Sequence, residues 1–557
     1  MRRPRLGSGY HHVREGGADD TRIRGVALEP ARFGIVIPRR PGRERGQWSR
    51  RLPDAYGGRG ERLSGELART RIHHVLADAA ARTPDAPAVR DATGCWTYAD
   101  LAAAARGTAE ALADRGVGPG ARVVTCAPPS RELVALLYAT SVLGAVFVPL
   151  HPDTRPGQLA TVMGETDAAA VLSGTGLRAL ADERKAGTRE RLRVRDTDVP
   201  PDSEIALLLY TSGSTARPKG IVCPHDSVLF SVRAIAEALS YRSDDVVFCR
   251  LPLSFDYGLY QILLSAHAGA ELVLAQDVPV VRVVRAVRSS RATVVPLVPS
   301  LADALLNLLA RNEHGLPTVR LFTNTGESLS PAVAKRLERA CPDAELFRMY
   351  GLSECKRVSI LAPGEAAGRP ESVGRPLPGT RVAILSPGGE ELGPRALGRI
   401  TVRGPHVMAG YWRSPELTAR VFPIHPGTGE RYLDTGDLGF VDEEGFLYFT
   451  GREDGVFKRR GVRMSIIEIE AAAVSLPGVR GAVALPPEPG RDLMLVVTGT
   501  LSSPEVIEGL ATLIEPAKVP ALCRTVDRLP LTANGKPDRR ALARLAREAA
   551  GSETAHG

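Results

Sequence analysis

Short apolar runs alternate with stretches of helical periodicity between Ile72 and Gly374. The runs lie at residues 122–126, 145–150, 169–172, 205–209, 246–249, 271–274 and 293–297. Strands that alternate with helices in this way are typical of α/β layers built on parallel sheets. The longest apolar stretch, around residues 133–150, is interrupted by small residues and ends in a proline-flanked loop. It therefore predicts a buried helix and strand rather than a membrane span.

Beyond Gly374 the apolar runs become short strands between Gly- and Pro-containing turns, which predicts a small β subdomain. The end of the chain is again a mixture of helices and strands. Helices are expected at 132–143, 465–474 and 504–514. The polar, turn-forming segment 451–455 separates the last two regions and is the predicted boundary. The chain is thus divided into an Arg-rich extension (1–65), a large domain (66–450), a hinge (451–455), a small domain (456–545) and a tail (546–557).

The formal net charge of +9 comes almost wholly from the first 65 residues. Residues 1–65 hold 15 Arg, no Lys and seven acidic residues, and they lack periodic apolar positions. This composition is typical of a disordered extension. The alternatives are an upstream extension that comes from a misassigned start codon, and a basic tail that contacts RNA or acidic membranes. Because the rest of the chain is near neutral, we expect no nucleic-acid partner and no membrane association.

The seven cysteines form no C-x-x-C pair, and no apolar segment follows the N-terminal arginines as it would in a secretory signal. An odd number of thiols fits a reducing compartment. We therefore expect a cytoplasmic protein with neither disulfides nor a metal cluster.

A segment rich in small hydroxylated residues and glycine follows directly on the apolar run 205–209. It reads Tyr210-Thr211-Ser212-Gly213-Ser214-Thr215-Ala216-Arg217-Pro218-Lys219-Gly220. Such residues after a strand let backbone N–H groups point toward an anion, and the lysine adds a positive charge. The spacing is not that of a Walker A motif. A flexible linker would not follow a buried strand, so the segment predicts a phosphate-binding loop formed by Thr211, Ser212, Gly213, Ser214, Thr215 and Lys219.

This loop resembles the phosphate loop of the adenylate-forming superfamily, which includes acyl-CoA synthetases, adenylation domains of nonribosomal peptide synthesis and beetle luciferases. The resemblance covers roughly residues 70–545, and further motifs follow in the family's order. It implies a large N-terminal region of two stacked α/β sheets with a small β-barrel-like subdomain. A small mobile α/β C-terminal lobe follows, and it swings between two half-reactions about a hinge residue that matches Asp454.

Two further motifs each follow a predicted strand. They are Asn324-Thr325-Gly326-Glu327 and Met349-Tyr350-Gly351-Leu352-Ser353-Glu354. By resemblance, Gly326 and Tyr350 contact the nucleotide, with the tyrosine packed on adenine. Ser353, where the family usually has threonine, contacts the phosphate, and Glu354 helps to hold Mg²⁺. A carboxylate beside a polyphosphate makes physical sense only with a metal between them. The alternative for Glu354 is an ordinary partner of a helix N-cap.

Two motifs near the end of the chain complete the resemblance. They are Tyr432-Leu433-Asp434-Thr435-Gly436-Asp437-Leu438-Gly439 and Leu529-Pro530-Leu531-Thr532-Ala533-Asn534-Gly535-Lys536. Asp437 matches the aspartate that accepts from both ribose hydroxyls, with an Asx turn as the alternative. Arg452 matches a residue that contacts ribose or phosphate. Lys536 matches the family's catalytic lysine, whose charge stabilises the forming acyl-adenylate.

The segment 251–260 resembles the family's acid pocket, with Phe255 as an aromatic gate. Asp256 stands where amino-acid-activating members bind the substrate ammonium, and a buried carboxylate needs such a partner. A helix cap is the alternative for Asp256. The other implied pocket residues are Tyr257, Tyr260, Thr323, Thr325, Met349, Arg357 and Val358. Two tyrosines narrow the pocket and favour a substrate with a small side chain. The alternative partners of Arg357 are a substrate carboxylate, Asp256 and solvent. An acidic amino acid, a small neutral one and an aryl acid therefore stay open.

We interpret the sequence as that of an AMP-forming acid–thiol ligase that uses ATP and Mg²⁺ to adenylate a carboxylic acid, with an amino acid favoured. Because no carrier segment follows Lys536, we expect a free-standing enzyme whose acceptor thiol is external. That thiol belongs to the phosphopantetheine of a discrete carrier protein or to coenzyme A. An acyl-CoA ligase for other acids and a non-catalytic nucleotide-binding homologue are the alternatives.

Overall fold

The computed structural model describes residues 35–36, 71–186, 204–211, 218–311, 315–327, 329–425, 429–452, 456–459, 462–487, 492–516, 518–532 and 536–544. Several predicted features lie outside these ranges: most of the extension 1–65, the tail 546–557, and residues Ser212, Gly213, Ser214, Thr215 and Asp454. Within the described ranges, no helix is both long and apolar enough to cross a membrane.

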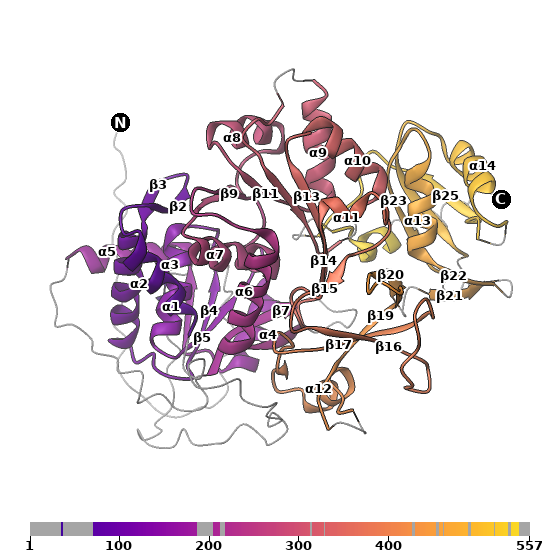
Figure 1. Ribbon diagram of the computed structural model, residues 1–557. Coiled ribbons are helices and arrows are strands. Elements are labelled where there is room, and N and C mark those ends of the chain that lie inside the picture. The colour runs from indigo at the N-terminus through magenta and orange to yellow at the C-terminus, as the bar shows by residue number, and fades with distance from the viewer. Residues whose placement is uncertain are drawn as a thin grey trace, which may run out of the picture.

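The first sheet is mixed, with parallel pairing among β6, β4, β5 and β7 and antiparallel pairing toward both edges, and it forms one layer of the large lobe (Figure 1). Its described strands pair in the order β1 (Ile35–Val36), β6 (Ala170–Ser173), β4 (Arg122–Cys126), β5 (Val146–Pro149), β7 (Ile205–Thr211), β8 (Lys219–Pro224) and β18 (Gly410–Tyr411). β7 and β8 form an antiparallel hairpin in which Thr211 pairs with Lys219. The backbone ladder therefore fixes the two ends of the predicted phosphate loop opposite each other.

The second sheet carries most of the predicted acid pocket. Its described strands pair in the order β15 (Arg375–Pro376), β14 (Ser359–Leu361), β13 (Glu345–Tyr350), β12 (Leu321–Asn324), β11 (Val294–Leu297), β9 (Val246–Cys249), β10 (Glu271–Leu274), β2 (Pro87–Asp91) and β3 (Gly94–Thr97). Strands β9, β11, β12 and β13 run parallel. The loops that follow them therefore meet at one edge of the sheet, as binding loops do in open α/β sheets.

Helices lie between and around the two sheets, as predicted for two stacked α/β layers (Figure 1). The inner group is α1 (Ile72–Arg82), α2 (Tyr98–Ala113), α3 (Arg131–Val142), α6 (His225–Leu239) and α7 (Asp256–Ala268). Helix α3 contacts strands of both sheets. The buried Tyr98 hydroxyl lies 2.7 Å from the carbonyl oxygen of Ala270, so its polar end is satisfied. The other described helices of this lobe are α4 (Pro156–Thr166), α5 (Gly174–Ala186), the 3₁₀ helix η4 (Val280–Arg282), α8 (Val283–Ser289), α9 (Pro299–Leu309), α10 (Pro331–Ala340), α11 (Pro363–Ala366) and α12 (Pro415–Val421).

The predicted β subdomain is an antiparallel sheet. Its described strands pair in the order β16 (Arg381–Leu385), β17 (Gly398–Arg403), β19 (Leu433–Val441) and β20 (Leu447–Arg452). Strand β20 continues through Gly451 to Arg452, so the first two residues of the predicted hinge lie in this sheet.

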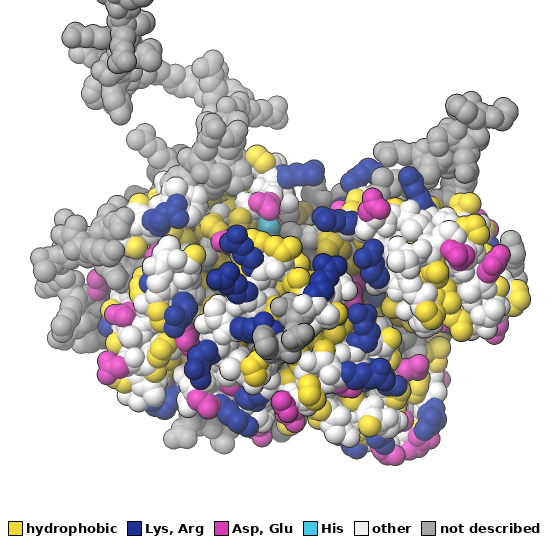
Figure 2. Space-filling model, turned by 90° about the horizontal axis from the view of Figure 1, so that it is seen from above, with side chains coloured by type: hydrophobic (Ala, Val, Ile, Leu, Met, Phe, Trp, Pro, Cys, Tyr) yellow, Lys and Arg dark blue, Asp and Glu magenta, His cyan; other side chains and the backbone are white. Residues whose placement is uncertain are grey.

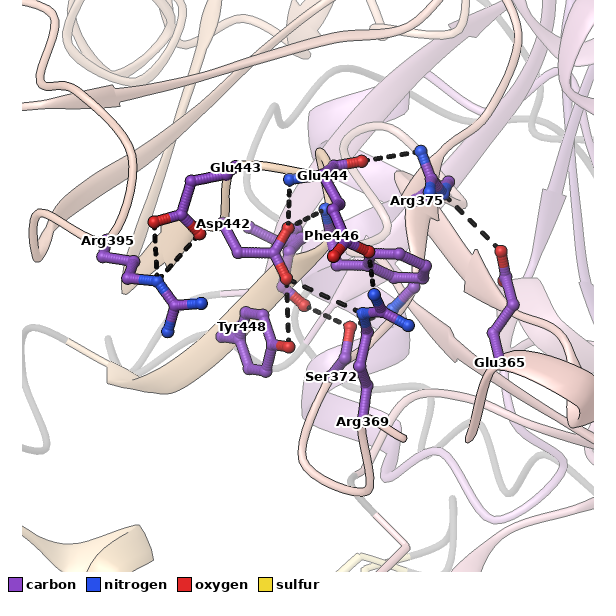
Figure 3. A network of polar contacts seen from close by, with 12 residues as sticks. Glu365, Arg369, Ser372, Arg375, Arg395, Asp442, Glu443, Glu444, Phe446 and Tyr448 are labelled. Atoms are coloured by element: carbon purple, nitrogen blue, oxygen red, sulfur yellow. Dashed lines mark hydrogen bonds and ion pairs between the residues drawn. The ribbon is translucent and has the colours of Figure 1, made fainter. Parts of the chain in front are cut away.

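A network of charged side chains fastens the β19–β20 turn to the segment before β15 (Figure 3). Asp442 accepts hydrogen bonds from the N–H groups of Glu444 and Phe446, at 3.0 and 2.8 Å. Arg369 forms ion pairs with Asp442 and Glu444. Arg369 and Arg375 also lie over the Phe446 ring, 4.1 and 4.2 Å from its centroid. Because β15 pairs with β14 and β14 with β13, the network sets the position of β19 relative to the end of β13.

The C-terminal lobe has its own core and is drawn in yellow tones in Figure 1. Its described elements are β21 (Val456–Arg459), β22 (Val462–Ser465), α13 (Ile466–Ser475), β23 (Val479–Leu485), β24 (Met494–Gly499), α14 (Ser503–Leu513) and β25 (Leu522–Thr525). Helices α3 and α13 begin next to residues whose hydroxyls accept backbone hydrogen bonds, Ser130 from Leu133 and Ser465 from Ile467. These caps shift both helices by one residue from their expected bounds.

We expect Asp442→Ala to lower the free energy of unfolding of the large lobe by about 1–3 kcal/mol, because it leaves the buried N–H group of Phe446 without its acceptor. Thermal unfolding followed by circular dichroism measures the effect. Glu443→Ala is the matched control, since this neighbouring carboxylate is exposed and its ion-pair partner among the described residues is the exposed Arg395. A control as damaging as Asp442→Ala would contradict the importance of the buried network.

Candidate active site

The predicted adenine and ribose residues meet at the junction of the second sheet with the β subdomain. Tyr350, at the end of β13, donates a hydrogen bond of 2.5 Å to Asp437, and its ring stacks on Phe449 with centroids 5.6 Å apart. Asp437 pairs across the β19–β20 ladder with Arg452, whose guanidinium lies 3.2 Å from its carboxylate. Asp437 lies inside a strand, and the neighbouring Asp434 accepts the Asx-type bond from Gly436. The Asx-turn alternative for Asp437 is therefore wrong.

Glu354 lies close to the base of the phosphate loop. Its carboxylate accepts a 2.7 Å hydrogen bond from Tyr411 of β18, and the Lys219 ammonium lies 5.9 Å from the centroid of the same ring. Strand β18 pairs with β8, which explains this proximity. No helix follows Glu354 directly, so it is not an N-cap partner. Sequence reasoning missed Tyr411, because its role arises from strand pairing with a distant segment.

One carboxylate alone does not make a metal site. The described residues contain no group of three His, Cys, Asp or Glu side chains that could hold an ion. Mg²⁺ is commonly held by one or two carboxylates together with substrate phosphates. Glu354, with one oxygen bonded to Tyr411 and the loop hairpin nearby, fits a magnesium ion that arrives with a nucleotide.

Lys536 belongs to the small lobe, and its side chain lies beside the predicted acid pocket. Its ammonium lies 5.6 Å from the centroid of the Phe255 ring. Gly326 has a φ of +84°, and a Cβ there would lie 3.0 Å from the Phe255 ring and 3.8 Å from Cε of Lys536. A side chain at this position would be strained by the positive φ and would press on the Phe255 ring. The predicted gate, nucleotide glycine and lysine lie side by side.

A carboxyl group that the sequence left without a role lies at this lobe boundary. Glu327 follows Gly326 and is partly buried. Burial raises its pKa to about 7, an effect that the positive charges of Lys536 and Arg539 oppose and the negative charge of Glu470 reinforces. Lys536, Arg539 and Glu470 all belong to the small lobe, so the protonation of Glu327 depends on how that lobe is docked.

The acid pocket contains a buried pair of opposite charges. Asp256 and Arg357 are 6% and 5% exposed, and the guanidinium lies 3.6 Å from the carboxylate. The Ser353 hydroxyl lies 3.5 Å from the other carboxylate oxygen. The N-cap of α7 is Phe255, and no side chain caps it by a hydrogen bond. The cap alternative for Asp256 is therefore wrong, and the described partners of its carboxylate are Arg357 and Ser353.

The remaining predicted pocket residues surround this pair. The Tyr257 hydroxyl lies 2.7 Å from both the Thr323 hydroxyl and its carbonyl oxygen, and Arg357 lies over the Tyr257 ring at 4.9 Å. Within the described residues, the buried hydroxyl of Thr325 and the buried Nε of Arg357 have no hydrogen-bond partner. The buried side chains of Tyr260, Met349 and Val358 complete the set. Unsatisfied buried donors are costly and suit a polar ligand.

Lys356 is a pocket cation that sequence reasoning missed. It is fully buried and adopts a φ of +63°. Its ammonium donates a 2.7 Å hydrogen bond to the Ser353 carbonyl oxygen and lies 5.7 Å from the centroid of the Tyr260 ring. Its place directly before Arg357 was the available signal in the sequence. The left-handed backbone conformation of Lys356 is not visible in the sequence.

The chain belongs to the AMP-binding enzyme family, whose pattern matches residues 76–412. It is 30% identical to novobiocin biosynthesis protein H of Streptomyces niveus, over 82% of this chain and 80% of that protein. It is 29% identical to a plipastatin synthase polypeptide of Bacillus subtilis (strain 168), over 85% of this chain but 19% of that protein, so it spans about a fifth of that relative's length. The structure of VinN in complex with L-aspartate is 41% identical with a TM-score of 0.62, covering 69% of this chain and 98% of that one. The chain is therefore a member of the adenylate-forming superfamily.

We expect Lys536→Ala to slow acyl-adenylate formation by about 10²–10³-fold, the usual cost of removing one group that stabilises transition-state charge. ATP affinity should change little. Single-turnover formation of the adenylate and equilibrium ATP binding separate the two effects. Lys518→Ala is the control, because that lysine pairs with Glu468 on the small lobe away from the pocket. A wild-type rate in Lys536→Ala would contradict the placement.

The docked position of the small lobe should depend on pH through Glu327. Burial raises the pKa of Glu327 to about 7, so this carboxyl group ionises as pH rises through about 7. Its anion is attracted by Lys536 and Arg539 and repelled by Glu470 across the lobe boundary, so the docking equilibrium should change over that pH range. Fluorescence energy transfer between the lobes should show this change in wild type and lose it in Glu327→Gln. Glu338→Gln, an exposed site on α10, should keep it. An unchanged profile in Glu327→Gln would contradict the assignment.

Proposed function

We propose that the protein adenylates an amino acid that carries a second carboxylate and passes the acyl group to the phosphopantetheine thiol of a separate carrier protein. The buried pair of Asp256 and Arg357 carries this proposal. The contacts of the Asp256 carboxylate are long, at 3.5 and 3.6 Å, and Arg357 keeps a free Nε–H within the described residues. Such a pair suits a ligand with both an ammonium and a carboxylate. VinN forms a complex with L-aspartate, which has these groups.

The nucleotide end of the site has a partner for each part of ATP. Tyr350 would pack on adenine, and Asp437 would accept from the ribose hydroxyls. The loop between Thr211 and Lys219 would hold the phosphates. Glu354 would hold Mg²⁺, which neutralises phosphate charge when it is bound.

The chemistry then follows from positioning. A carboxylate oxygen of the substrate attacks the α-phosphorus of ATP, the bond to the bridging oxygen breaks, and pyrophosphate leaves. Lys536, beside the Phe255 gate, offsets the negative charge that develops on the α-phosphate. After the small lobe turns, a thiolate attacks the acyl carbon and AMP leaves. Two conformations of one lobe thus serve two half-reactions.

Substrate-dependent ATP–pyrophosphate exchange tests the proposal. The panel contains L-aspartate, L-glutamate, β-amino dicarboxylic acids, L-asparagine, L-alanine, succinate and aryl acids. We expect exchange with a dicarboxylic amino acid and much less with asparagine or succinate, each of which lacks one of the two charges. Exchange only with succinate or aryl acids would contradict the assignment of Asp256. Exchange only with neutral amino acids would contradict the assignment of Arg357.

We expect Arg357→Lys to raise the KM for the dicarboxylic substrate by about 10–100-fold, the cost of losing a hydrogen bond to a charged group. The lysine keeps a cation beside Asp256 but removes the free Nε–H. The KM for the neutral amide analogue should change far less, and comparison of the two KM values is the measurement. Arg348→Lys, at a site that bonds the Pro370 carbonyl oxygen, is the control. Equal changes for both substrates would contradict a carboxylate contact.

A further inference from the structure

One segment of the chain holds both the backbone and the side chain of Glu354. The Tyr411 hydroxyl donates a hydrogen bond of 2.7 Å to Oε1 of the Glu354 carboxylate. The N–H group of Met408, three residues earlier, donates a 2.9 Å hydrogen bond to the Glu354 carbonyl oxygen. The other carboxylate oxygen, Oε2, makes no hydrogen bond or ion pair with another described residue. Because each carboxylate oxygen is an acceptor, Oε2 is available to a ligand.

Tyr411 is itself fixed from several sides. It is 4% exposed, and β18 pairs it with Ile221 of β8. Its N–H group donates a 2.9 Å hydrogen bond to the hydroxyl of Thr418 in α12, and its ring packs edge-on against Phe422 with centroids 5.7 Å apart. The preceding Gly410 has a φ of +121°, and a Cβ there would collide with the Thr418 side chain. A hydroxyl group held so firmly can fix the direction of the carboxylate that it contacts.

The Tyr411 ring also has a cation beside it that could compete for this carboxylate. The ammonium of Lys219, at the end of the phosphate loop, lies 5.9 Å from the centroid of the ring. Lys219 and Glu354 both lie in the described ranges, and no ion pair joins them. A Glu354 side chain that turned to the lysine would neutralise two charges, one suited to a phosphate and the other to a metal.

The charge of the surrounding surface favours a metal that arrives already bound to a nucleotide. Seen from above, Lys and Arg side chains gather over the surface around α8 to α10 (Figure 2). The exposed cations there include Arg285, Arg291, Lys335 and Arg339. Such a surface attracts polyphosphates and repels free divalent cations. A carboxylate already held in place can contact the incoming metal without first reorganising.

We propose that Tyr411 is a positioning residue for the metal-binding carboxylate. Its hydroxyl holds Oε1 of Glu354, keeps this side chain from pairing with Lys219, and leaves Oε2 to the Mg²⁺ that accompanies ATP. This inference rests on the proposed function, since it deepens the role given there to Glu354. Hydrogen-bond partners of metal-binding side chains commonly contribute about 10–100-fold to metal affinity, because they orient the ligand atoms.

The test measures binding of the α,β-methylene analogue of ATP to the full chain by isothermal titration, once with saturating Mn²⁺ and once with EDTA. We expect Tyr411→Phe to weaken binding of the Mn²⁺ complex by about 10–100-fold and to change binding of the metal-free analogue far less. Tyr98→Phe is the control, because it removes another buried hydroxyl, whose 2.7 Å hydrogen bond goes to the Ala270 carbonyl oxygen. The control should match wild type under both conditions.

A double-mutant cycle tests whether Tyr411 acts through Glu354. Glu354→Gln removes the charge that holds the metal and should itself weaken binding of the Mn²⁺ complex. Addition of Tyr411→Phe to Glu354→Gln should then cause no further loss, because the hydroxyl no longer has a carboxylate to direct. Additive losses from the two substitutions would overturn the proposal.

The remaining outcomes separate this inference from the proposed function. No acid substrate is present, so an error in the assignment of the acid does not affect the test. A wild type that binds the analogue neither with Mn²⁺ nor with EDTA would overturn the proposed function and this inference together. A wild type that binds the Mn²⁺ complex no better than Tyr411→Phe does would overturn the role of Tyr411 alone. Equal losses with and without Mn²⁺ would also overturn it, since the hydroxyl would then support the nucleotide site as a whole.

Discussion

The buried pair of Asp256 and Arg357 is the interaction on which the acid site depends. Removing two charges from water is costly, and a separation of 3.6 Å recovers that cost only in part. Lys356 adds a further buried cation beside them. Buried charges of this kind lower the stability of the fold unless they are compensated, but they suit a ligand that brings one positive and one negative group. Under the proposed function, the selectivity of this pocket and its cost in stability both arise from the same buried charges.

Sheet topology brings the separate parts of the site together. Parallel strands β9, β11, β12 and β13 place their loops at one edge, and that edge carries Asp256, Gly326 and Arg357. The β subdomain adds Asp437 by antiparallel pairing, and the network around Asp442 holds that strand against the second sheet (Figure 3). Lys536 arrives from a lobe with its own core. Under the proposed function, movement of this lobe would supply the Lys536 charge to one half-reaction without disturbing the nucleotide site.

Much of this architecture could be predicted from sequence, because apolar periodicity reports burial directly. The alternation before Gly374 and the change of pattern after it correspond to the two α/β sheets and the β subdomain. The structure joins Tyr350 to Asp437 by a hydrogen bond and places Lys536 beside Phe255, and the roles implied for these residues stay predictions. Contacts between segments distant in sequence could not be predicted in the same way. Tyr411 reaches Glu354 only because β18 pairs with β8, and the burial of Lys356 depends on a left-handed backbone.

The central claim is that Asp256 receives the ammonium group of the substrate. Isothermal titration with two non-reactive adenylate analogues, aspartyl-sulfamoyl-adenosine and its desamino counterpart succinyl-sulfamoyl-adenosine, tests it most directly. The two ligands differ only in the amino group. The account predicts that the amino analogue binds wild type at least about tenfold more tightly, the value of a charge-assisted hydrogen bond, and that Asp256→Asn abolishes the difference. Equal affinities of the two analogues for the wild type would contradict it.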